Sequence, residues 1–266
     1  MGASEPRPLA LVTGASSGIG FELARQFAEH GFDLVIAAED AAINTVAQQL
    51  SDGVRVEPVQ VDLTTQQGVE QLWARVSSDG RGLEAAALNA GVGEGGAFAG
   101  GTDLEKELTL VDLNVRSTVH LAKRVVDKMV DQGEGRILFT SSIASTMPGP
   151  YQAVYNASKS FVQSFALALR NELKDAGVSV TSLMPGPTDT DFFNRADMLD
   201  TQVGAGEKDD PADVARDGFE ALMSGEERVV SSSLKTKLQG RASRLMPDSA
   251  KAEMHRKMAE PGSDED

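Results

Sequence analysis

Tyr155 and Lys159 form the pair in this sequence whose types and spacing best suit acid–base chemistry. On a helix, residues four positions apart lie on one face, so the lysine can lie beside the phenol. A free tyrosine has a pKa of about 10, and a nearby ammonium favours its phenolate form and brings it toward a useful range for proton transfer. Ser142 comes thirteen residues earlier, and its hydroxyl could hydrogen-bond a substrate carbonyl and stabilise developing charge.

A glycine-rich segment, Thr13–Gly20, follows a predicted strand and opens a predicted helix. Glycines let the backbone turn sharply, and the free N–H groups of a helix start attract a pyrophosphate. The spacing is Gly-x-x-x-Gly-x-Gly, which fits the general dinucleotide fingerprint only loosely, and no Lys-Ser/Thr pair follows that would make a P-loop. An unspecialised glycine turn stays open as an alternative. The candidate cofactor residues here are Gly14, Ser16, Ser17, Gly18, Ile19 and Gly20.

Glu39 stands at the end of the second predicted strand, 19 residues past Gly20. A dinucleotide site places an acid at this point to accept hydrogen bonds from the adenosine ribose hydroxyls. A carboxylate there repels a 2′-phosphate, and no basic residue in 15–17 would attract one. We therefore expect NAD(H) to be favoured over NADP(H). The adjacent Asp40 is an alternative acceptor, and Glu39 could simply be a solvated surface residue.

Short apolar runs alternate with longer amphipathic stretches, which is the pattern of repeated βαβ units. Helices are predicted at about 18–30, 42–50, 66–76, 103–131, 151–176 and 210–223, and two short helical patterns follow the last strand. This order implies one α/β domain over residues 1–266, with a mostly parallel, doubly wound sheet covered by helices on both faces. A loop or lid is expected at about 188–209, and a disordered acidic tail at about 260–266. The predicted strands are Leu9–Thr13, Leu34–Ala38, Val54–Val61, Leu83–Leu88, Arg136–Thr140, Val178–Met184 and Val229–Ser232.

The composition argues against several classes of partner. The net charge is −15, from 40 Asp and Glu against 25 Lys and Arg, so the surface repels nucleic-acid phosphates and anionic lipids. No Cys is present, which excludes disulfides and thiolate chemistry, and the three histidines have no zinc-like partners. No apolar run is long enough for a membrane span, and the first residues lack the features of a secretion signal. We expect a soluble, cytoplasmic protein with no metal, nucleic-acid or membrane partner.

The ordered motifs resemble those of the short-chain dehydrogenase/reductase family over roughly residues 8–232. The resemblance implies a Rossmann-type sheet of order 3-2-1-4-5-6-7 and hydride transfer between nicotinamide C4 and the carbon of a ketone or secondary alcohol. A small-molecule alcohol or carbonyl substrate is therefore expected. The C-terminus lacks the glycine-rich ending common in tetrameric members, so a homo-oligomer is possible but a tetramer is not assumed. The motifs are Thr13–Gly20, Asn89-Ala90-Gly91, Asn114, Ser142, Tyr155, Lys159 and Pro185-Gly186.

The resemblance also implies a role for each of these positions. Tyr155 would be the acid in reduction and the base in oxidation, while Lys159 would lower its pKa and hold the nicotinamide ribose. Ser142 would orient the substrate oxygen, and Asn114 would bind a water that links Lys159 to solvent. Asp62 and Leu63 would flank the adenine. Further cofactor contacts are implied for Asn89, Ala90, Gly91, Tyr155, Pro185, Gly186, Thr188 and Thr190.

Two rival interpretations remain. A non-catalytic dinucleotide sensor or interaction module could retain the same fold. The catalytic set argues against it, because a pure binder needs no proton relay. A sugar-nucleotide epimerase or dehydratase uses similar Tyr–Lys chemistry but usually carries a larger C-terminal substrate region.

A group of apolar side chains flanks the expected site. They could form a substrate face or simply pack in the core or lid: Met147, Phe192, Phe193, Met198 and Leu199.

Overall fold

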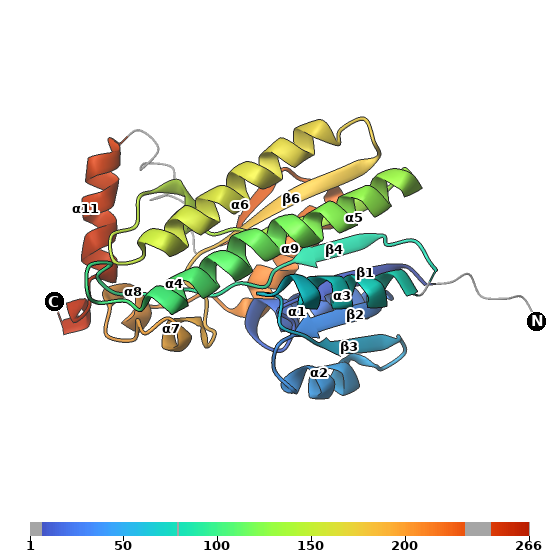
Figure 1. Ribbon diagram of the computed structural model, residues 1–266, viewed down its shortest axis with the longest axis horizontal. Coiled ribbons are helices and arrows are strands. Elements are labelled where there is room, and N and C mark those ends of the chain that lie inside the picture. Colours follow the sequence, from blue (N-terminus) through green and yellow to red (C-terminus); the bar gives the residue numbers. More distant parts are fainter. Residues whose placement is uncertain (1–6, 79, 232–245, 266) are drawn as a thin grey trace, which may run out of the picture.

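Short runs of Leu, Val, Ile and Ala form the strands, because a parallel sheet with helices on both faces buries the side chains of either side. The computed structural model describes residues 7–78, 80–231 and 246–265. Its seven parallel strands follow the order β3-β2-β1-β4-β5-β6-β7, which confirms the implied Rossmann-type sheet (Figure 1). The strand ends lie within two residues of their predicted places. The strands are β1 (Leu9–Thr13), β2 (Asp33–Ala38), β3 (Val56–Gln60), β4 (Ala85–Leu88), β5 (Gly135–Thr140), β6 (Val178–Pro185) and β7 (Arg228–Ser231).

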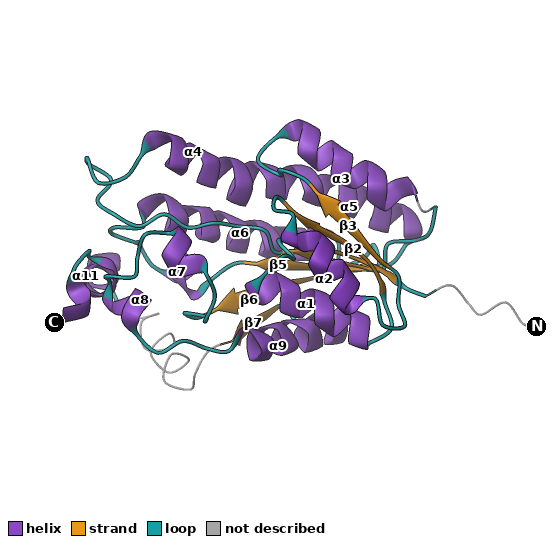
Figure 2. Ribbon diagram, turned by 90° about the horizontal axis from the view of Figure 1, so that it is seen from below, coloured by secondary structure: helices purple, strands orange, loops and turns teal. Residues whose placement is uncertain are grey.

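Alternate residues of a strand supply two separate cores, one on each face of the sheet. In β1, Leu9 and Leu11 pack into one core and Ala10 and Val12 into the other. The helices of the described ranges do not have the length and apolarity that a membrane span needs. The first core is covered by α3 (Gln66–Ser78), α5 (Thr118–Gln132) and α6 (Ala153–Glu172), and the second by α1 (Gly18–Glu29), α2 (Ala42–Leu50) and α9 (Pro211–Ser224) (Figure 2).

The long helix predicted over 103–131 is interrupted. It consists of α4 (Leu104–Val111), a π-helical segment (Asp112–Ser117) and α5 (Thr118–Gln132). A π-helical turn holds one more residue than an α-helical turn, and such turns often occur at functional sites. The buried Asn114 lies within it. The apolar pattern alone cannot show this extra residue, because the pattern resumes on the far side.

The helix that carries Tyr155 and Lys159 begins later than predicted. We expected a helix from Tyr151 to Ala176, but α6 starts at Ala153 and ends at Glu172. Tyr151 has a φ of 63°, a left-handed conformation that a tyrosine rarely adopts and that excludes it from the helix. Its carbonyl accepts a hydrogen bond from the Gly96 N–H at 2.8 Å, which ties this corner to the loop after β4.

The segment 188–209 contains two short helices, α7 (Phe192–Arg195) and α8 (Gln202–Ala205), joined by loops. We call 188–209 the lid segment. Of the two short helical patterns predicted after β7, one lies outside the described residues. The other is α11 (Asp248–Ala259), which packs against α8 at one end of the molecule (Figure 1).

The acidic tail differs from the disordered segment predicted at about 260–266. A 3-10 turn (Ser263–Glu265) follows α11. The Gly262 N–H donates to Oδ2 of Asp200 at 3.1 Å, and Oγ of Ser263 accepts from the Gln202 N–H at 3.0 Å. The composition of the tail cannot show these partners, because they are supplied by the distant lid segment. That residues 1–266 form a single domain stays a prediction.

Candidate active site

The glycine-rich turn lies between the carboxyl end of β1 and the start of α1. Gly14 has a φ of 66° and Gly18 a φ of 55°, values that favour glycine. A Cβ on Gly20 would lie 2.0 Å from the carbonyl oxygen of Gly14, so no larger residue fits. Ser17, the N-cap of α1, makes no side-chain capping hydrogen bond. The first N–H groups of α1 thus lack their usual partner and can bind an anion.

Side chains join three neighbouring strand ends beneath this turn. The hydroxyl of Thr13 accepts hydrogen bonds from the N–H groups of Asn89 and Ala90, each at 3.0 Å. The Asn89 amide donates to the Thr13 carbonyl at 3.1 Å and accepts from the Thr140 hydroxyl at 2.9 Å. These bonds fix the ends of β1, β4 and β5 where the strand order reverses direction, which is where open α/β sheets bind ligands.

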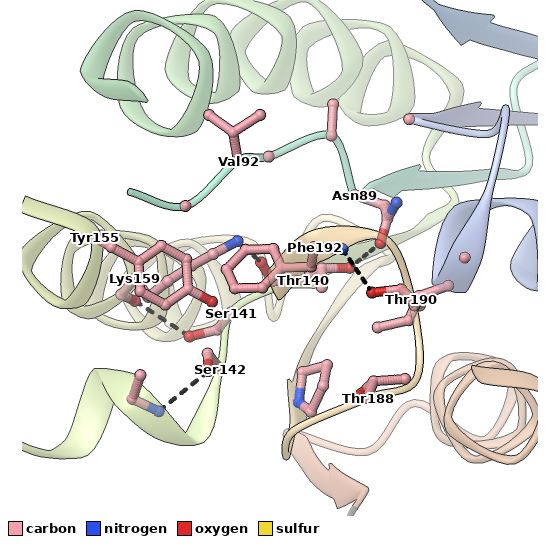
Figure 3. A pocket seen from close by; sticks show the side chains of 18 of the residues that line it. Asn89, Val92, Thr140, Ser141, Ser142, Tyr155, Lys159, Thr188, Thr190 and Phe192 are labelled. Atoms are coloured by element: carbon pink, nitrogen blue, oxygen red, sulfur yellow. Dashed lines mark hydrogen bonds between the residues drawn. The ribbon is translucent and has the colours of Figure 1, made fainter. Parts of the chain in front are cut away.

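Tyr155, Lys159 and Ser142 lie together on one side of the cavity, opposite Thr188 and Thr190 (Figure 3). The Lys159 Nζ lies 5.9 Å from the centre of the Tyr155 ring and donates to the Thr140 carbonyl at 3.0 Å. The Ser142 hydroxyl shares a hydrogen bond with Tyr155 and accepts another from the Ala144 N–H at 3.1 Å. The spacing along α6 therefore places phenol and amine together, and the turn after β5 adds the Ser142 hydroxyl beside them.

Burial dominates the titration of this pair. It raises the pKa of Tyr155 to about 12, against the opposing effect of the hydrogen bond with Ser142. It lowers the pKa of Lys159 to about 8. The lowering of the Tyr155 pKa by Lys159 stays a prediction, because desolvation and the Ser142 hydrogen bond are the causes that set the direction here. Tyr155 is therefore held in its protonated form at neutral pH, the form that a proton donor needs.

Asn114 uses its whole side-chain amide to hold the loop after β4. Its Oδ1 accepts from the Val92 N–H at 2.9 Å, and its Nδ2 donates to the Val92 carbonyl at 2.8 Å and to the Ser158 hydroxyl at 3.1 Å. A Cβ on Gly91 would lie 3.1 Å from Oδ1 of Asn114 and 3.2 Å from Nζ of Lys159. The backbone at Gly91 thus passes close to both side chains.

Glu39 and Asp40 have different surroundings at the end of β2. Asp40 accepts the Ser16 hydroxyl at 2.7 Å and the Ala42 N–H at 3.0 Å, so both of its carboxylate oxygens have partners. Glu39 is exposed at the rim of the cavity, and no described residue bonds its carboxylate. Between the two acids, Glu39 is therefore the one that can still accept hydrogen bonds from a ligand.

The chain after β6 crosses the cavity toward the glycine turn. The Thr188 hydroxyl donates to the Gly186 carbonyl at 2.9 Å, and the Thr190 hydroxyl accepts from the Phe192 N–H at 3.3 Å. A Cβ on Gly18 would lie 2.9 Å from Cγ2 of Thr190. The Phe192 ring reaches toward Tyr155, with the ring centres 5.3 Å apart (Figure 3).

One cavity of about 910 Å³ is lined by every residue predicted for the site except Asn114, which stands behind it. At the end of β3, Asp62 accepts both the N–H and the hydroxyl of Thr64, and Leu63 is buried. Sequence reasoning missed one wall of the cavity, because no motif marks it. It comes from α11 and is formed by Met254, His255, Met258 and Ala259.

A family model described as short chain dehydrogenase matches residues 8–199. The chain belongs to the short-chain dehydrogenase family. "Sulfoacetaldehyde reductase 2" of Chromohalobacter salexigens is 32% identical over 186 residues, which cover 69% of this chain and 74% of the relative. The match of the family model ends before α9, β7 and α11.

Solved structures resemble this short-chain dehydrogenase over most of its length. A short-chain dehydrogenase from Sphingobium yanoikuyae in complex with NADPH is 30% identical, with a TM-score of 0.79, and the match covers 90% of this chain and 95% of that one. A 3-ketoacyl-(acyl-carrier-protein) reductase from Brucella melitensis complexed with NADH is 26% identical, with a TM-score of 0.75 and coverage of 85% and 97%. This short-chain dehydrogenase is accordingly an NAD(P)-binding oxidoreductase of CH–OH and C=O groups.

Proposed function

We propose that the protein transfers a hydride between a nicotinamide dinucleotide and the carbon of a ketone or secondary alcohol, with Tyr155 as the acid and base. The observation that carries the proposal is the shared position of three groups. The phenol of Tyr155, the hydroxyl of Ser142 and the amine of Lys159 line the same cavity as the glycine turn. A dinucleotide bound at that turn would bring its reactive end toward them.

The residues around the cavity fit a dinucleotide. Gly20 leaves room that a Cβ would fill, and the uncapped start of α1 suits a pyrophosphate. We further propose that NAD(H) binds in preference to NADP(H), because the carboxylate of Glu39 can accept ribose hydroxyls and repels a 2′-phosphate. The relative from Sphingobium yanoikuyae was solved with NADPH and the one from Brucella melitensis with NADH, so structures of relatives contain one or the other cofactor.

Each catalytic residue has a distinct task in this proposal. In reduction, Tyr155 donates its proton to the substrate oxygen, and Ser142 hydrogen-bonds the same oxygen. Lys159, held at the Thr140 carbonyl, keeps N–H groups for the nicotinamide ribose. Asn114 would hold a water that links Lys159 to solvent, as the family resemblance implies, in addition to its bonds with Val92. A nicotinamide held there would supply or accept the hydride, and the positive charge of its oxidised form would favour the phenolate of Tyr155.

Replacing Tyr155 by Phe tests this function. The variant lacks the proton donor but keeps the ring, so turnover should fall by a factor of about 10² to 10⁴ while cofactor affinity stays within about threefold. Cofactor absorbance measures turnover, and titration of cofactor fluorescence measures binding. Persisting turnover would reject the role of Tyr155. Cofactor binding without turnover of any carbonyl by the unmodified protein would favour the sensor interpretation.

A homo-oligomer and a cytoplasmic location are further parts of the proposal. Leu104, Leu108 and Val111 are exposed on one face of α4, and a second copy could cover them. Light scattering after size-exclusion chromatography measures the assembly, and a monomer at micromolar concentration would exclude this part. The acidic charge balance supports the expectation that no nucleic acid binds.

A further inference from the structure

The far wall of the cavity is made by α11, which lies outside the region that the family model matches. Met254 and Met258 are one helical turn apart and both line the cavity, each partly buried. Met147 faces the same cavity from the loop after β5, and Phe193 and Val203 line it from the lid segment. Thioether side chains are unbranched and polarisable, so they adapt to apolar groups of irregular shape.

The helix α11 is fixed to the corner that precedes the catalytic helix. The Nδ1 of His255 donates to the Pro150 carbonyl at 3.1 Å. The Tyr151 hydroxyl donates to Oε1 of Glu260 at 2.5 Å and accepts from Arg256 at 3.0 Å. Ala259 is buried in a small core with residues of α7 and its flanks. The wall is thus held in place from two directions.

The charges that line the cavity leave no open cation for an anionic substrate within the described ranges. Arg195 pairs with Asp191 at 2.8 Å, and Arg228 lies 3.8 Å from Glu227. Burial lowers the pKa of His255, which keeps the imidazole neutral at pH 7. Lys159 is bound to the Thr140 carbonyl beside Tyr155, at the reacting end rather than at the far wall.

We propose that α11 is the substrate-selecting wall, in which Met254 and Met258 hold the bulky apolar substituent of an uncharged ketone or its secondary alcohol. This inference rests on the proposed function and narrows its substrate class. It also separates this chain from the relative named as a sulfoacetaldehyde reductase, because sulfoacetaldehyde carries a sulfonate. Burying a sulfonate against two thioethers would leave its charge unpaired, which is costly.

A panel of carbonyl compounds tests the class with the unmodified protein. It contains a bulky aryl ketone, a small methyl ketone and an aldehyde or ketone with a sulfonate or carboxylate, each with both nicotinamide cofactors. We expect kcat/KM for the bulky ketone to exceed that for the anionic compound by about tenfold or more. A preference for the anionic compound would overturn the inference and leave the proposed function intact. No turnover of any compound would instead overturn the proposed function, and the inference with it.

The double variant Met254→Gln/Met258→Gln tests the two residues. Glutamine matches methionine in length and helix propensity but adds an amide, so it places polar atoms where the apolar substituent would lie. The ratio of kcat/KM for the bulky ketone to kcat/KM for the small ketone should fall about tenfold. Lys257→Gln, on the exposed side of α11, should keep the ratio of the unmodified protein. An unchanged ratio in a folded double variant, checked by circular dichroism, would overturn the assignment.

Discussion

Different kinds of contact hold the two halves of the cavity in place. We call the half at the glycine turn the cofactor half, and the half at the lid segment and α11 the substrate half. The cofactor half is built from backbone and short side chains, where the hydroxyl of Thr13 and the amide of Asn89 join strand ends and glycines leave no spare room. The substrate half is built from long side chains of distant segments, such as Tyr151, Arg256 and Glu260. Backbone contacts of the first kind tolerate almost no substitution, whereas exposed pairs of the second kind contribute little each.

This difference indicates how one scaffold can keep its chemistry while its specificity changes. In the cofactor half, a Cβ on Gly14 or Gly20 would meet backbone atoms at 2.9 Å and 2.0 Å, respectively. In the substrate half, an exchanged side chain meets a cavity or solvent. The four experiments below test whether the two halves differ in this way.

Gly20→Ala should have the largest effect. The new Cβ would lie 2.0 Å from the Gly14 carbonyl oxygen, so the turn must move. We expect cofactor affinity to fall about a hundredfold and the free energy of unfolding to fall by about 3 kcal/mol. Calorimetric titration and urea unfolding measure these quantities. Gly82→Ala is the control, since its Cβ would meet only the Gln132 side chain at 3.5 Å. If both variants lost cofactor affinity and stability equally, the close packing at Gly20 would not explain how firmly the cofactor half is built.

Lys159 lies where the halves meet, and its burial should make stability depend on pH. Its folded pKa of about 8 lies below the ordinary 10.5, so between these values the unfolded chain binds more protons and stability rises with pH. Lys159→Met removes this dependence. The variant's stability relative to the unmodified protein should therefore decrease from pH 7 to pH 10, by at most about 3 kcal/mol. Urea unfolding at both pH values measures the change. If the difference in stability between the variant and the unmodified protein were the same at both pH values, the lowered pKa of Lys159 would be wrong.

Glu39→Arg tests an exposed position within the cofactor half, where we expect a substitution to change cofactor preference rather than the fold. The change replaces a carboxylate that repels a 2′-phosphate by a cation that attracts one. We expect the ratio of NADPH affinity to NADH affinity to rise about tenfold or more. Asp52→Arg makes the same charge change at an exposed position away from the cavity and should leave the ratio unaltered. Tighter binding of NADPH by the unmodified protein would show that the assignment of Glu39 fails.

Glu260→Gln should have the smallest effect on stability. The Arg256–Glu260 pair is exposed, so its loss should lower the free energy of unfolding by less than about 1 kcal/mol. The KM for a bulky ketone should respond more than the stability does, since α11 loses one tie to Tyr151. Asp127→Asn, which removes an exposed pair on α5, is the matched control. A loss above about 2 kcal/mol would mean that the substrate half is as firmly built as the cofactor half.

The sequence predicted the glycine turn and the strands around it because local geometry dictates them. The positive φ of Gly14 and the tight approach at Gly20 both require glycine, and a strand followed by such a turn and a helix has few other uses. The i, i+4 spacing of Tyr155 and Lys159 likewise follows from helix geometry. These features depend on residues that are close together in the sequence, so the sequence alone can predict them.

The substrate half could not be predicted in the same way. The left-handed Tyr151, the order of the tail around Gly262 and the wall formed by α11 all depend on partners more than 50 residues away. Nothing in the local pattern of 248–259 distinguishes a cavity wall from an ordinary surface helix. The lowering of the Tyr155 pKa by Lys159 stays a prediction for a related reason, since the extent of burial is a property of the assembled site.

The π-helical segment between α4 and α5 holds one more residue in its turn than an α-helix would. This extra residue sets the direction in which each helix faces. One residue turns an α-helix by about 100°, so winding the same residues as an unbroken α-helix would rotate one half against the other by about that angle. Either Asn114 would swing away from Val92, or the apolar stripe of α4 would change the direction in which it faces. The extra residue therefore lets Asn114 reach Val92 while the exposed apolar face of α4 keeps its direction.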